Sequence, residues 1–346
     1  MITRMQTDLL ATSATTCAGK AVGVAIELLR KGDLVALPTE TVYGLAADAL
    51  NSIAVAKIFE AKERPRFDPL IVHLPNRKWL ERIVDVPAGD RQLIGKLADS
   101  FWPGPFTIVL PKREIVPDIV TAGLDTVAVR ISSHTVFTEI VGELDEPLAA
   151  PSANRFGRVS PTTGQHVLDE LDGRIPLIVD AGPTEHGLES TIVAVRDGRI
   201  AVLRRGPITH EQLSQFAVIT SVVATPKISS PGQFPSHYAP KTLLRLIDNA
   251  DDFFAQKNQR VGLLAWHAKR SDLPLAERQA RGGRSLKFAA VRSLSERQDL
   301  REAAANLFRH VRELDALGLD LIVAERVPSL GLGAAIMDRL ERASYR

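Results

Sequence analysis

Three cations crowd the end of a predicted helix and the start of a predicted strand: Lys62, Arg64 and Arg66, in the stretch AKERPRFDPLIVHL. Cations at the carboxyl end of a helix interact favourably with its dipole, which is a sufficient structural explanation. The chemical interpretation is a clamp for the phosphates of a nucleotide, with the lysine as a compact charge and Arg64 as a two-pronged donor. His73 ends the strand, and it is either a buried structural histidine or a group that orients a carboxylate ligand.

Hydroxyl-bearing residues follow another predicted strand, in the stretch LPTETVYGL. The strand ends at Pro38, and Thr39, Thr41 and Tyr43 come next. Hydroxyl groups at the carboxyl end of a strand can line a crevice for a small molecule. The alternative is a turn whose threonines bind their own backbone, and this stretch alone does not separate the two.

Two further regions place small polar residues beside predicted strands. In AAPSANRFGRVSPTT, Ser152 and Asn154 alternate, so on an extended backbone they share one face, where hydroxyls and amides could hold phosphate oxygens. In HGLESTIV and VLRRGPIT, Ser190 opens a strand and Arg204 ends one. The sequence has no GxxxxGKS or GxxxxGKT loop, and no GxGxxG follows the first strand, so ATP would be bound without a Walker loop.

The composition is that of a soluble globular protein long enough for two domains, with 346 residues, 45% hydrophobic and 24% charged. The formal net charge is only +2, but residues 257–312 hold thirteen Lys or Arg against five Asp or Glu. Such a basic segment could meet RNA or another polyanion, and a solvated, partly helical surface is an equally good interpretation.

Several classes of protein are excluded. Cys17 is the only cysteine, which excludes an internal disulfide and a cysteine-rich zinc site, and no residue is assigned as a metal ligand. No apolar run approaches the roughly 20 residues of a membrane span, so we expect no membrane association. Asp8 and Glu27 argue against a targeting peptide. We therefore expect a cytoplasmic protein.

Short apolar strands alternate with helical patterns in the first two thirds of the chain. The predicted strands are 34–38, 70–74, 106–111, 126–131, 147–151, 176–180 and 190–195. The predicted helices are 18–31, 51–62, 90–100, 134–144 and 163–171. Asn51 and Ser52 form a cap for the second helix, and Gly32 ends the first. Residues 190–195 and 199–203 are too close for a helical crossover and must form a hairpin, so the sheet is mixed.

The pattern divides the chain into three parts. We predict an α/β domain over 1–217, a Pro- and Ser-rich linker over 218–240, and a small α/β domain over 241–346. Phe234 and Tyr238 in the linker indicate that it packs against something. The last part has predicted strands at 243–247, 260–266 and 319–325 and predicted helices at 295–314 and 334–343.

Taken together, these stretches closely resemble the threonylcarbamoyl-adenylate synthase family in its long, two-domain form. The shared stretches are PTETVYGL, KERPRFDPLIVH, WPGPFTIVL, TAGLDTVAVR, APSAN, ESTIV, LRRGPIT, SPG followed by HYAP, and GLGAAIMDRLERAS, and they run from about residue 20 to residue 344. The resemblance implies a YrdC-like first domain, with a twisted mixed sheet and a deep, positively charged central cavity, and a smaller Rossmann-like α/β domain after it.

The resemblance also implies an activity. Such an enzyme, a nucleotidyltransferase, condenses L-threonine, bicarbonate and ATP into L-threonylcarbamoyl-AMP and releases pyrophosphate, with Mg²⁺ on the triphosphate. The product supplies the threonylcarbamoyl group that a partner transferase complex adds to a tRNA adenosine beside the anticodon. A weak contact with tRNA is a further expectation.

The family's site residues carry over to matching positions of this sequence, with Lys62 and Arg64 as the catalytic cations. The predicted ATP-binding residues are Lys62, Arg64, Asp68, Thr126, Ser152, Asn154, Ser160, Arg204 and Tyr238. The predicted L-threonine-binding residues are Thr41, His73, Arg130, Ala150 and Ser190. Tyr238 would come from the linker, which lies over the site in this family.

Three positions depart from the family pattern. Asp68 stands where asparagine is common, which adds a negative charge near the expected triphosphate. The linker lacks a cation between Gln233 and Ser236, so a direct linker contact to phosphate is in doubt. Arg205 replaces a common proline and adds a cation without an assigned role.

Two other functions compete with the synthase hypothesis. A double-stranded RNA-binding module would use the same cavity and the basic segment for backbone phosphates, with strongly salt-dependent binding. A carbamoyl transferase of the hydrogenase-maturation type shares the motifs of the first domain, but it needs zinc-binding cysteine clusters, which a chain with one cysteine does not have.

Overall fold

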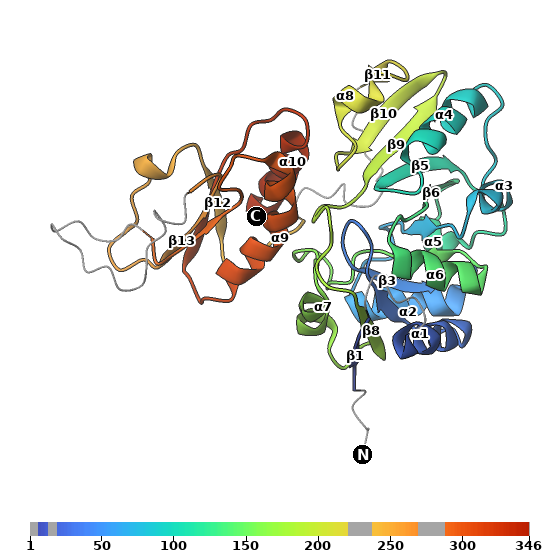
Figure 1. The fold of residues 1–346 in the computed structure, drawn as a ribbon, viewed down its shortest axis with the longest axis horizontal. Coiled ribbons are helices and arrows are strands. Elements are labelled where there is room, and N and C mark those ends of the chain that lie inside the picture. The colour runs from blue at the N-terminus through green and yellow to red at the C-terminus, as the bar shows by residue number, and fades with distance from the viewer. Residues whose placement is uncertain (1–5, 13–18, 221–236, 269–287, 346) are drawn as a thin grey trace. The chain divides into compact units, whose positions relative to one another are not determined.

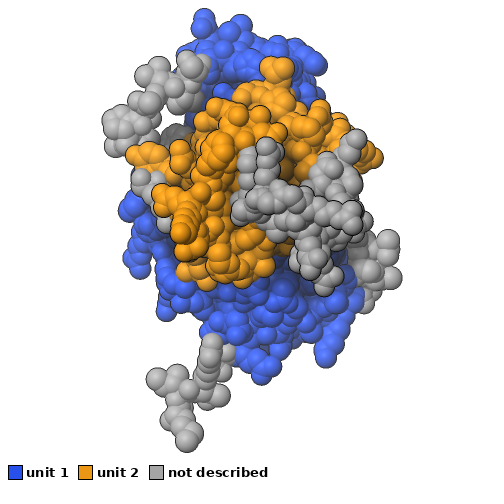
Figure 2. All heavy atoms as spheres, turned by 90° about the vertical axis from the view of Figure 1, so that its left-hand side faces the viewer, with its two compact units in different colours: residues 1–156, 160–233 blue, residues 157–159, 234–346 orange. Residues whose placement is uncertain are grey.

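The computed structural model of the protein describes residues 6–12, 19–220, 237–268 and 288–345. Cys17, the linker residues 221–236 with their Gln233–Ser236 departure, and part of the basic segment lie outside the described residues. The chain forms two compact units, residues 1–156 with 160–233 and residues 157–159 with 234–346 (Figure 2). Each unit has its own sheet and its own apolar core.

The first unit is built on one mixed sheet of eleven strands (Figure 1). In spatial order these are β1 (Asp8–Ala11), β8 (Leu177–Asp180), β2 (Val35–Leu37), β3 (Gly44–Asp48), β7 (Leu148–Ala149), β4 (Ile71–His73), β6 (Thr126–Arg130), β5 (Phe106–Pro111), β9 (Thr191–Arg196), β10 (Arg199–Arg204) and β11 (Ile219–Thr220). Strands β9 and β10 pair antiparallel, which confirms the predicted hairpin, whereas β4 pairs parallel with β6 and β5 with β9. The predicted α/β class with a mixed sheet is confirmed.

The helices of this unit are mostly short. They are α1 (Lys20–Arg30), α2 (Ser52–Lys62), α3 (Leu80–Ile83), α4 (Arg91–Phe101), α5 (Asp118–Thr121), α6 (Thr135–Leu144), α7 (Gly164–Leu171) and α8 (His210–Leu213), with a 3-10 turn η1 (Arg77–Trp79). The Asn51 side chain accepts hydrogen bonds from the first amides of α2, as predicted. Gly32 follows α1 with a φ of 74°, a left-handed conformation that glycine adopts without strain. Lys62 is the last residue of α2, so its side chain extends from the carboxyl end of that helix.

The two faces of the sheet differ in character. Successive residues of a strand point to opposite faces, so Val127 and Val129 of β6 join the main core, whereas Thr126 and Arg130 point the other way. A small, separate apolar cluster lies on that second face, made of Ile71, Val109, Ala128 and Ile192. We call the face that carries this cluster the site face, because the predicted site residues of β4 and β6 project from it.

The second unit has a smaller sheet in which all described strands are parallel. Its order is β12 (Leu244–Ile247), β15 (Leu321–Glu325), β13 (Val261–Ala265) and β14 (Ala290–Ser293), with a 3-10 turn η2 (Ala250–Asp252). Helix α9 (Leu300–Asp315) packs on β13 and β14, and α10 (Gly333–Ser344) packs on β12. This is the smaller Rossmann-like domain that the sequence predicted. No helix in either unit is both long and apolar enough to span a bilayer, as far as the described residues show.

Strands β1, β3, β11 and β14 and the short helices α3, α5 and α8 are not among the predicted elements, and two of the differences have a clear local cause. Helix α9 was predicted from residue 295 but begins at Leu300, because the Asp299 side chain accepts hydrogen bonds from the first amides of the helix. Residues 295–299 instead form a turn in which Ser295 Oγ accepts from the amides of Arg297 and Asp299. Strand β3 was not predicted, since its sequence GLAAD lacks β-branched residues.

Strand β3 exists because its glycine allows two backbones to approach. A Cβ atom at Gly44 would lie only 3.2 Å from the Cβ of Ala150, and Gly44 bridges to Ser152 across that gap. The adjacent amide of Leu45 donates to the Pro151 carbonyl at 2.7 Å. The APSAN stretch is thereby fixed beside the turn that precedes β3.

Candidate functional site

A row of side chains crosses neighbouring strands of the site face. His73 on β4 pairs with Arg130 on β6, and the β5–β6 register continues the row to Thr107. Thr107 lies opposite Ile192 on β9, which lies opposite Arg204 on β10. Residues that face each other in adjacent strands point to the same side of a sheet. Sheet pairing therefore brings together predicted residues that are far apart in the sequence.

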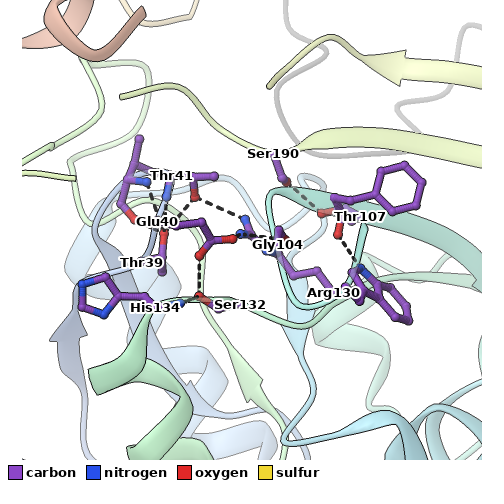
Figure 3. Close-up of polar contacts among 12 residues, drawn as sticks. Thr39, Glu40, Thr41, Gly104, Thr107, Arg130, Ser132, His134 and Ser190 are labelled. Carbon is purple, nitrogen blue, oxygen red and sulfur yellow. Dashed lines mark hydrogen bonds and ion pairs between the residues drawn. The ribbon is translucent and has the colours of Figure 1, made fainter. Parts of the chain in front are cut away.

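Arg130 is at the centre of a buried network (Figure 3). Its Nη2 donates to Glu40 and forms an ion pair with it, while its Nη1 donates to Thr41 Oγ1 at 3.2 Å. A longer contact reaches the Gly104 carbonyl at 3.4 Å, and Ser132 Oγ donates to the second carboxylate oxygen of Glu40 at 2.5 Å. Both charged side chains are only 3% exposed, so each offsets the cost of burying the other.

Thr39 fixes the turn that presents Glu40 and Thr41. Its Oγ1 donates to the Val42 carbonyl at 2.7 Å and accepts from the amides of Thr41 and Val42 at 3.1 and 3.2 Å. This is the backbone-binding threonine turn that the sequence offered as an alternative. The same turn also directs Thr41 toward Arg130, so the two interpretations are compatible here.

His73 is buried beside this network. Its ring lies 4.7 Å from the Phe137 ring, centre to centre. Burial lowers the pKa of His73 well below its usual range, and the nearby Arg130 cation acts in the same direction, against a hydrogen bond with the Ala150 backbone. A neutral His73 therefore lies next to Arg130 and Ala150, two other residues predicted to bind the amino acid.

Lys62 reaches from the end of α2 to the APSAN stretch. Its Nζ donates to the Ser152 carbonyl at 2.6 Å and also to the Asn154 carbonyl. The side chain is 1% exposed, and burial lowers its pKa well below the usual range, with the Arg64 cation adding to the effect. The predicted K-x-R and S-x-N motifs thus form one structural unit around this lysine.

Arg64 and Asp68 form a buried ion pair beside Lys62. Arg64 Nη2 lies 2.8 Å from Asp68 Oδ2, and the guanidinium also donates to the carbonyls of Asp68 and Pro69. Burial raises the pKa of Asp68, while the cations Arg64, Lys62 and Arg204, in that order, oppose the rise. Three predicted nucleotide-binding cations therefore act on one carboxylate.

Ser190 connects Arg204 to the row on the site face. Arg204 donates to the Ser190 carbonyl at 3.1 Å and to its Oγ at 3.0 Å, and Thr107 Oγ1 lies 2.8 Å from the same hydroxyl. Gly206 allows this arrangement, since a Cβ there would lie 2.5 Å from the Glu189 carbonyl oxygen. Nearby, Ser160 Oγ donates to the buried Glu189 carboxylate at 2.5 Å.

Thr126, a predicted nucleotide ligand, and Arg130, a predicted amino-acid ligand, lie at opposite ends of β6, whereas Arg204 of the nucleotide set binds Ser190 of the amino-acid set directly. Arg130 is four residues beyond Thr126 on β6, about 13 Å away at the usual rise of a strand. The apolar cluster of the site face lies between the two ends.

Tyr238 belongs to the second unit, where its own surroundings account for its burial. Its ring stacks on Phe308 with 5.5 Å between centroids, and the Arg339 guanidinium lies 5.1 Å from its centroid. Its φ is 62°, which is uncommon for a residue with a side chain. Its role as a nucleotide ligand stays a prediction.

Four buried residues of the network were missed by reasoning from the sequence. They are Glu40, Thr107, Ser132 and Glu189. The two acids had a detectable signal, because each lies in a hydroxyl-rich stretch next to an apolar strand, and a buried acid needs a partner. No local feature of the sequence indicates the partner of Glu40, since Arg130 lies 90 residues away.

A separate surface pocket of about 230 Å³ lies between η1 and α4. Arg77, Lys78 and Arg91 supply cations at its wall. None of the predicted site residues lines it, so it is no part of the site described above.

Comparisons with known proteins identify the family of the chain. A family model described as "Telomere recombination" matches residues 27–206, and the model "Threonylcarbamoyl-AMP synthase, C-terminal domain" matches residues 208–344. The threonylcarbamoyl-AMP synthase of Pyrococcus abyssi is 36% identical, with 94% of both chains covered, and that of Bacillus subtilis is 39% identical, with 93% of this chain and 92% of the relative covered.

A solved structure shows the same fold over the whole length. The crystal structure of P. abyssi Sua5 complexed with L-threonine matches with a TM-score of 0.82 and 33% identity, covering 98% of this chain and 97% of that one. The matches thus include both units. The chain therefore belongs to the threonylcarbamoyl-AMP synthase family of enzymes.

Proposed function

We propose that this enzyme condenses L-threonine, bicarbonate and ATP into L-threonylcarbamoyl-AMP and releases pyrophosphate. The observation that carries the proposal is the set of buried cations Lys62, Arg64 and Arg204, whose charges all act on Asp68, together with the buried Arg130 at the last residue of β6. These cations support binding of a triphosphate and of an amino-acid carboxylate by the first unit. The relatives' shared activity supplies the chemistry.

At the amino-acid end, the predicted ligands are held by different strands and turns. Arg130 would bind the threonine carboxylate through charge-assisted hydrogen bonds. Its partners there are Thr41, His73, Ala150 and Ser190. The relative solved with bound L-threonine supports this assignment of the substrate.

At the nucleotide end, the cations are held by the backbone rather than by a glycine-rich loop. Lys62 and Arg64 would contact the triphosphate, and the APSAN stretch that Lys62 organises would contribute Ser152 and Asn154. Thr126, Ser160 and Arg204 complete the proposed set within the first unit. We keep Tyr238 as a proposed ligand on the family resemblance alone.

The chemistry suits such a site. The threonine amine must attack the carbon of bicarbonate with loss of water, and an oxygen of the resulting carbamate must then attack the α-phosphorus of ATP and displace pyrophosphate. Both reactants are anions, so a preorganised cluster of cations offsets their repulsion and stabilises the added charge of the transition state. Orientation of three small reactants supplies much of the remaining rate enhancement.

Mg²⁺ fits the site as a companion of the triphosphate. The described residues contain no group of three or more His, Cys, Asp or Glu that could hold a metal ion, and Mg²⁺ commonly binds through phosphates with one or two carboxylates. Asp68 Oδ1, which has no hydrogen-bond partner among the described residues, would be that carboxylate. When bound, the ion would neutralise charge on the leaving pyrophosphate.

The proposed product would be consumed by a tRNA-modifying transferase complex. Its mixed anhydride carries an activated threonylcarbamoyl group, which the partner would transfer to a tRNA adenosine. A weak contact of this chain with tRNA is part of the proposal, as is a cytoplasmic location.

Pyrophosphate release tests the function directly. With ATP and Mg²⁺ present, release should require both L-threonine and bicarbonate, and the nucleotide product should carry the mass of threonylcarbamoyl-AMP. Release at the same rate without threonine would contradict the proposal. Salt-sensitive binding of duplex RNA that does not depend on ATP would favour the RNA-binding alternative instead.

A further inference from the structure

Glu40 is buried beside Arg130 but belongs to neither proposed ligand set. It is buried in the turn after β2, and both of its carboxylate oxygens are in use: one binds Arg130 Nη2 and the other binds Ser132 Oγ at 2.5 Å (Figure 3). Its backbone carbonyl also accepts from the His186 amide at 2.9 Å. An acid held at three points has little freedom to bind a substrate itself.

Arg130, in contrast, has unused donor capacity. Its Nη groups are directed to Glu40, Thr41 and the Gly104 carbonyl. Its Nε is buried and has no hydrogen-bond partner among the residues that the structure describes. A buried N–H without a partner costs free energy, so this donor indicates an acceptor that arrives with a ligand. A substrate carboxylate is an acceptor of the right charge.

We propose that Glu40 is a positioning residue, which holds the Arg130 guanidinium in one plane so that its Nε–H is presented to the carboxylate of the amino-acid substrate. The inference rests on the proposed function, because it needs that substrate. Glu40 supplies no proton and accepts none in this role. Glu40 instead fixes the orientation of the Arg130 guanidinium, and its negative charge balances that of Arg130 when no substrate is bound.

The alternative role for a buried acid in this place is general base for the substrate amine. The hydrogen bonds argue against that role, since Arg130 and Ser132 already occupy the two oxygens. His134, also in this corner, takes part through its backbone amide, which donates to Ser132 Oγ at 3.2 Å. Ser132 is therefore a second part of the same support.

The test compares ligands with and without a carboxylate. Glu40→Gln keeps the size of the side chain but removes its charge. Binding of L-threonine, measured by calorimetry, should weaken roughly 10- to 100-fold, as expected when a charge-assisted contact is lost. Binding of L-threonine amide, which has no carboxylate, should change less than about threefold, and ATP should bind as in the wild type.

Controls separate positioning from damage to the fold. Glu27→Gln removes the same charge from an exposed pair on α1 and should leave threonine binding unchanged. Ser132→Ala should give a smaller loss with the same preference for the carboxylate ligand, and it tests the idea even if Glu40→Gln folds poorly. An equal loss for threonine and its amide would overturn the proposal. Failure of the wild type to bind threonine would instead contradict the proposed function.

Discussion

Lys62 combines a charge that the proposed reaction needs with surroundings that oppose the charge. It is buried, its direct hydrogen-bond partners are two carbonyls, and Arg64 lies nearby. Desolvation lowers its pKa, so the charged form costs stability in the folded state. As pH rises from the lowered pKa of Lys62 in the folded protein toward the unfolded value near 10.5, this cost disappears and the free energy of unfolding increases. We therefore expect that Lys62 is retained because the proposed reaction needs its charge.

Lys62→Met should lower ATP-dependent turnover by about 100-fold or more, because a cation at the triphosphate is lost. The melting temperature should stay the same or rise, since the desolvation cost disappears with the charge. Pyrophosphate release and thermal unfolding measure the two effects. Lys57→Met, on the same helix but paired with Asp33, is the matched control and should keep its activity. A Lys62→Met protein that fails to fold would show that the lysine is mainly structural.

Helix α2 carries Lys62 at its last residue, while the Asn51 cap that precedes its first residue stabilises the helix. The Asn51 side chain accepts from the amides of Ile53 and Ala54 at 3.0 and 3.1 Å. Asn51→Ala should therefore destabilise the first unit by about 1 kcal/mol. Lys62 is anchored independently by two carbonyls, so the KM for ATP should change less than about twofold.

Urea unfolding and steady-state kinetics check this separation of the two helix ends. Asn76→Ala removes the cap of the short turn η1, which is outside helix α2, and gives a reference for the loss of a cap alone. A tenfold rise in the KM for ATP without a loss of stability would show that the cap positions Lys62 directly.

The sequence predicted elements with a strong local signal and missed those formed by long-range contacts. The strands that end in His73 and Arg130 have a clear apolar pattern, and the Asn51 cap is a local hydrogen bond. Strand β3 has no such pattern and depends on the close approach that Gly44 permits. The same distinction holds in the site, where Arg130 was predicted from its motif but its partner Glu40 was not.

At the scale of the whole molecule, the division into units does not follow the chain strictly. Residues 157–159 group with the second unit, where Gly157 accepts from the Ala239 amide at 2.9 Å and Val159 accepts from Arg312. These partners are more than 80 residues apart in sequence, so no local pattern could reveal them. The exact domain boundaries stay a prediction.

Acid should destabilise the second unit through His310 of α9. Burial lowers the pKa of His310 to about 4, with Arg309 and Arg292 acting in the same direction and Glu313 opposing it. Between pH 6.5 and about 4, the unfolded chain binds a proton there that the folded chain does not, so stability falls as pH falls. The loss amounts to at most about 3 kcal/mol over this window.

His310→Gln should remove most of this loss, because glutamine binds no proton. Hydrogen exchange of the α9 amides between pH 7 and 4 measures the loss of stability in the second unit alone. A local measurement is needed because the lowered pKa of His73 makes the first unit less stable in acid as well. His210→Gln, at an exposed histidine of α8, is the control and should keep the wild-type slope. If His310→Gln lost stability with acid as steeply as the wild type, the neutral state assigned to His310 in the folded protein would be wrong.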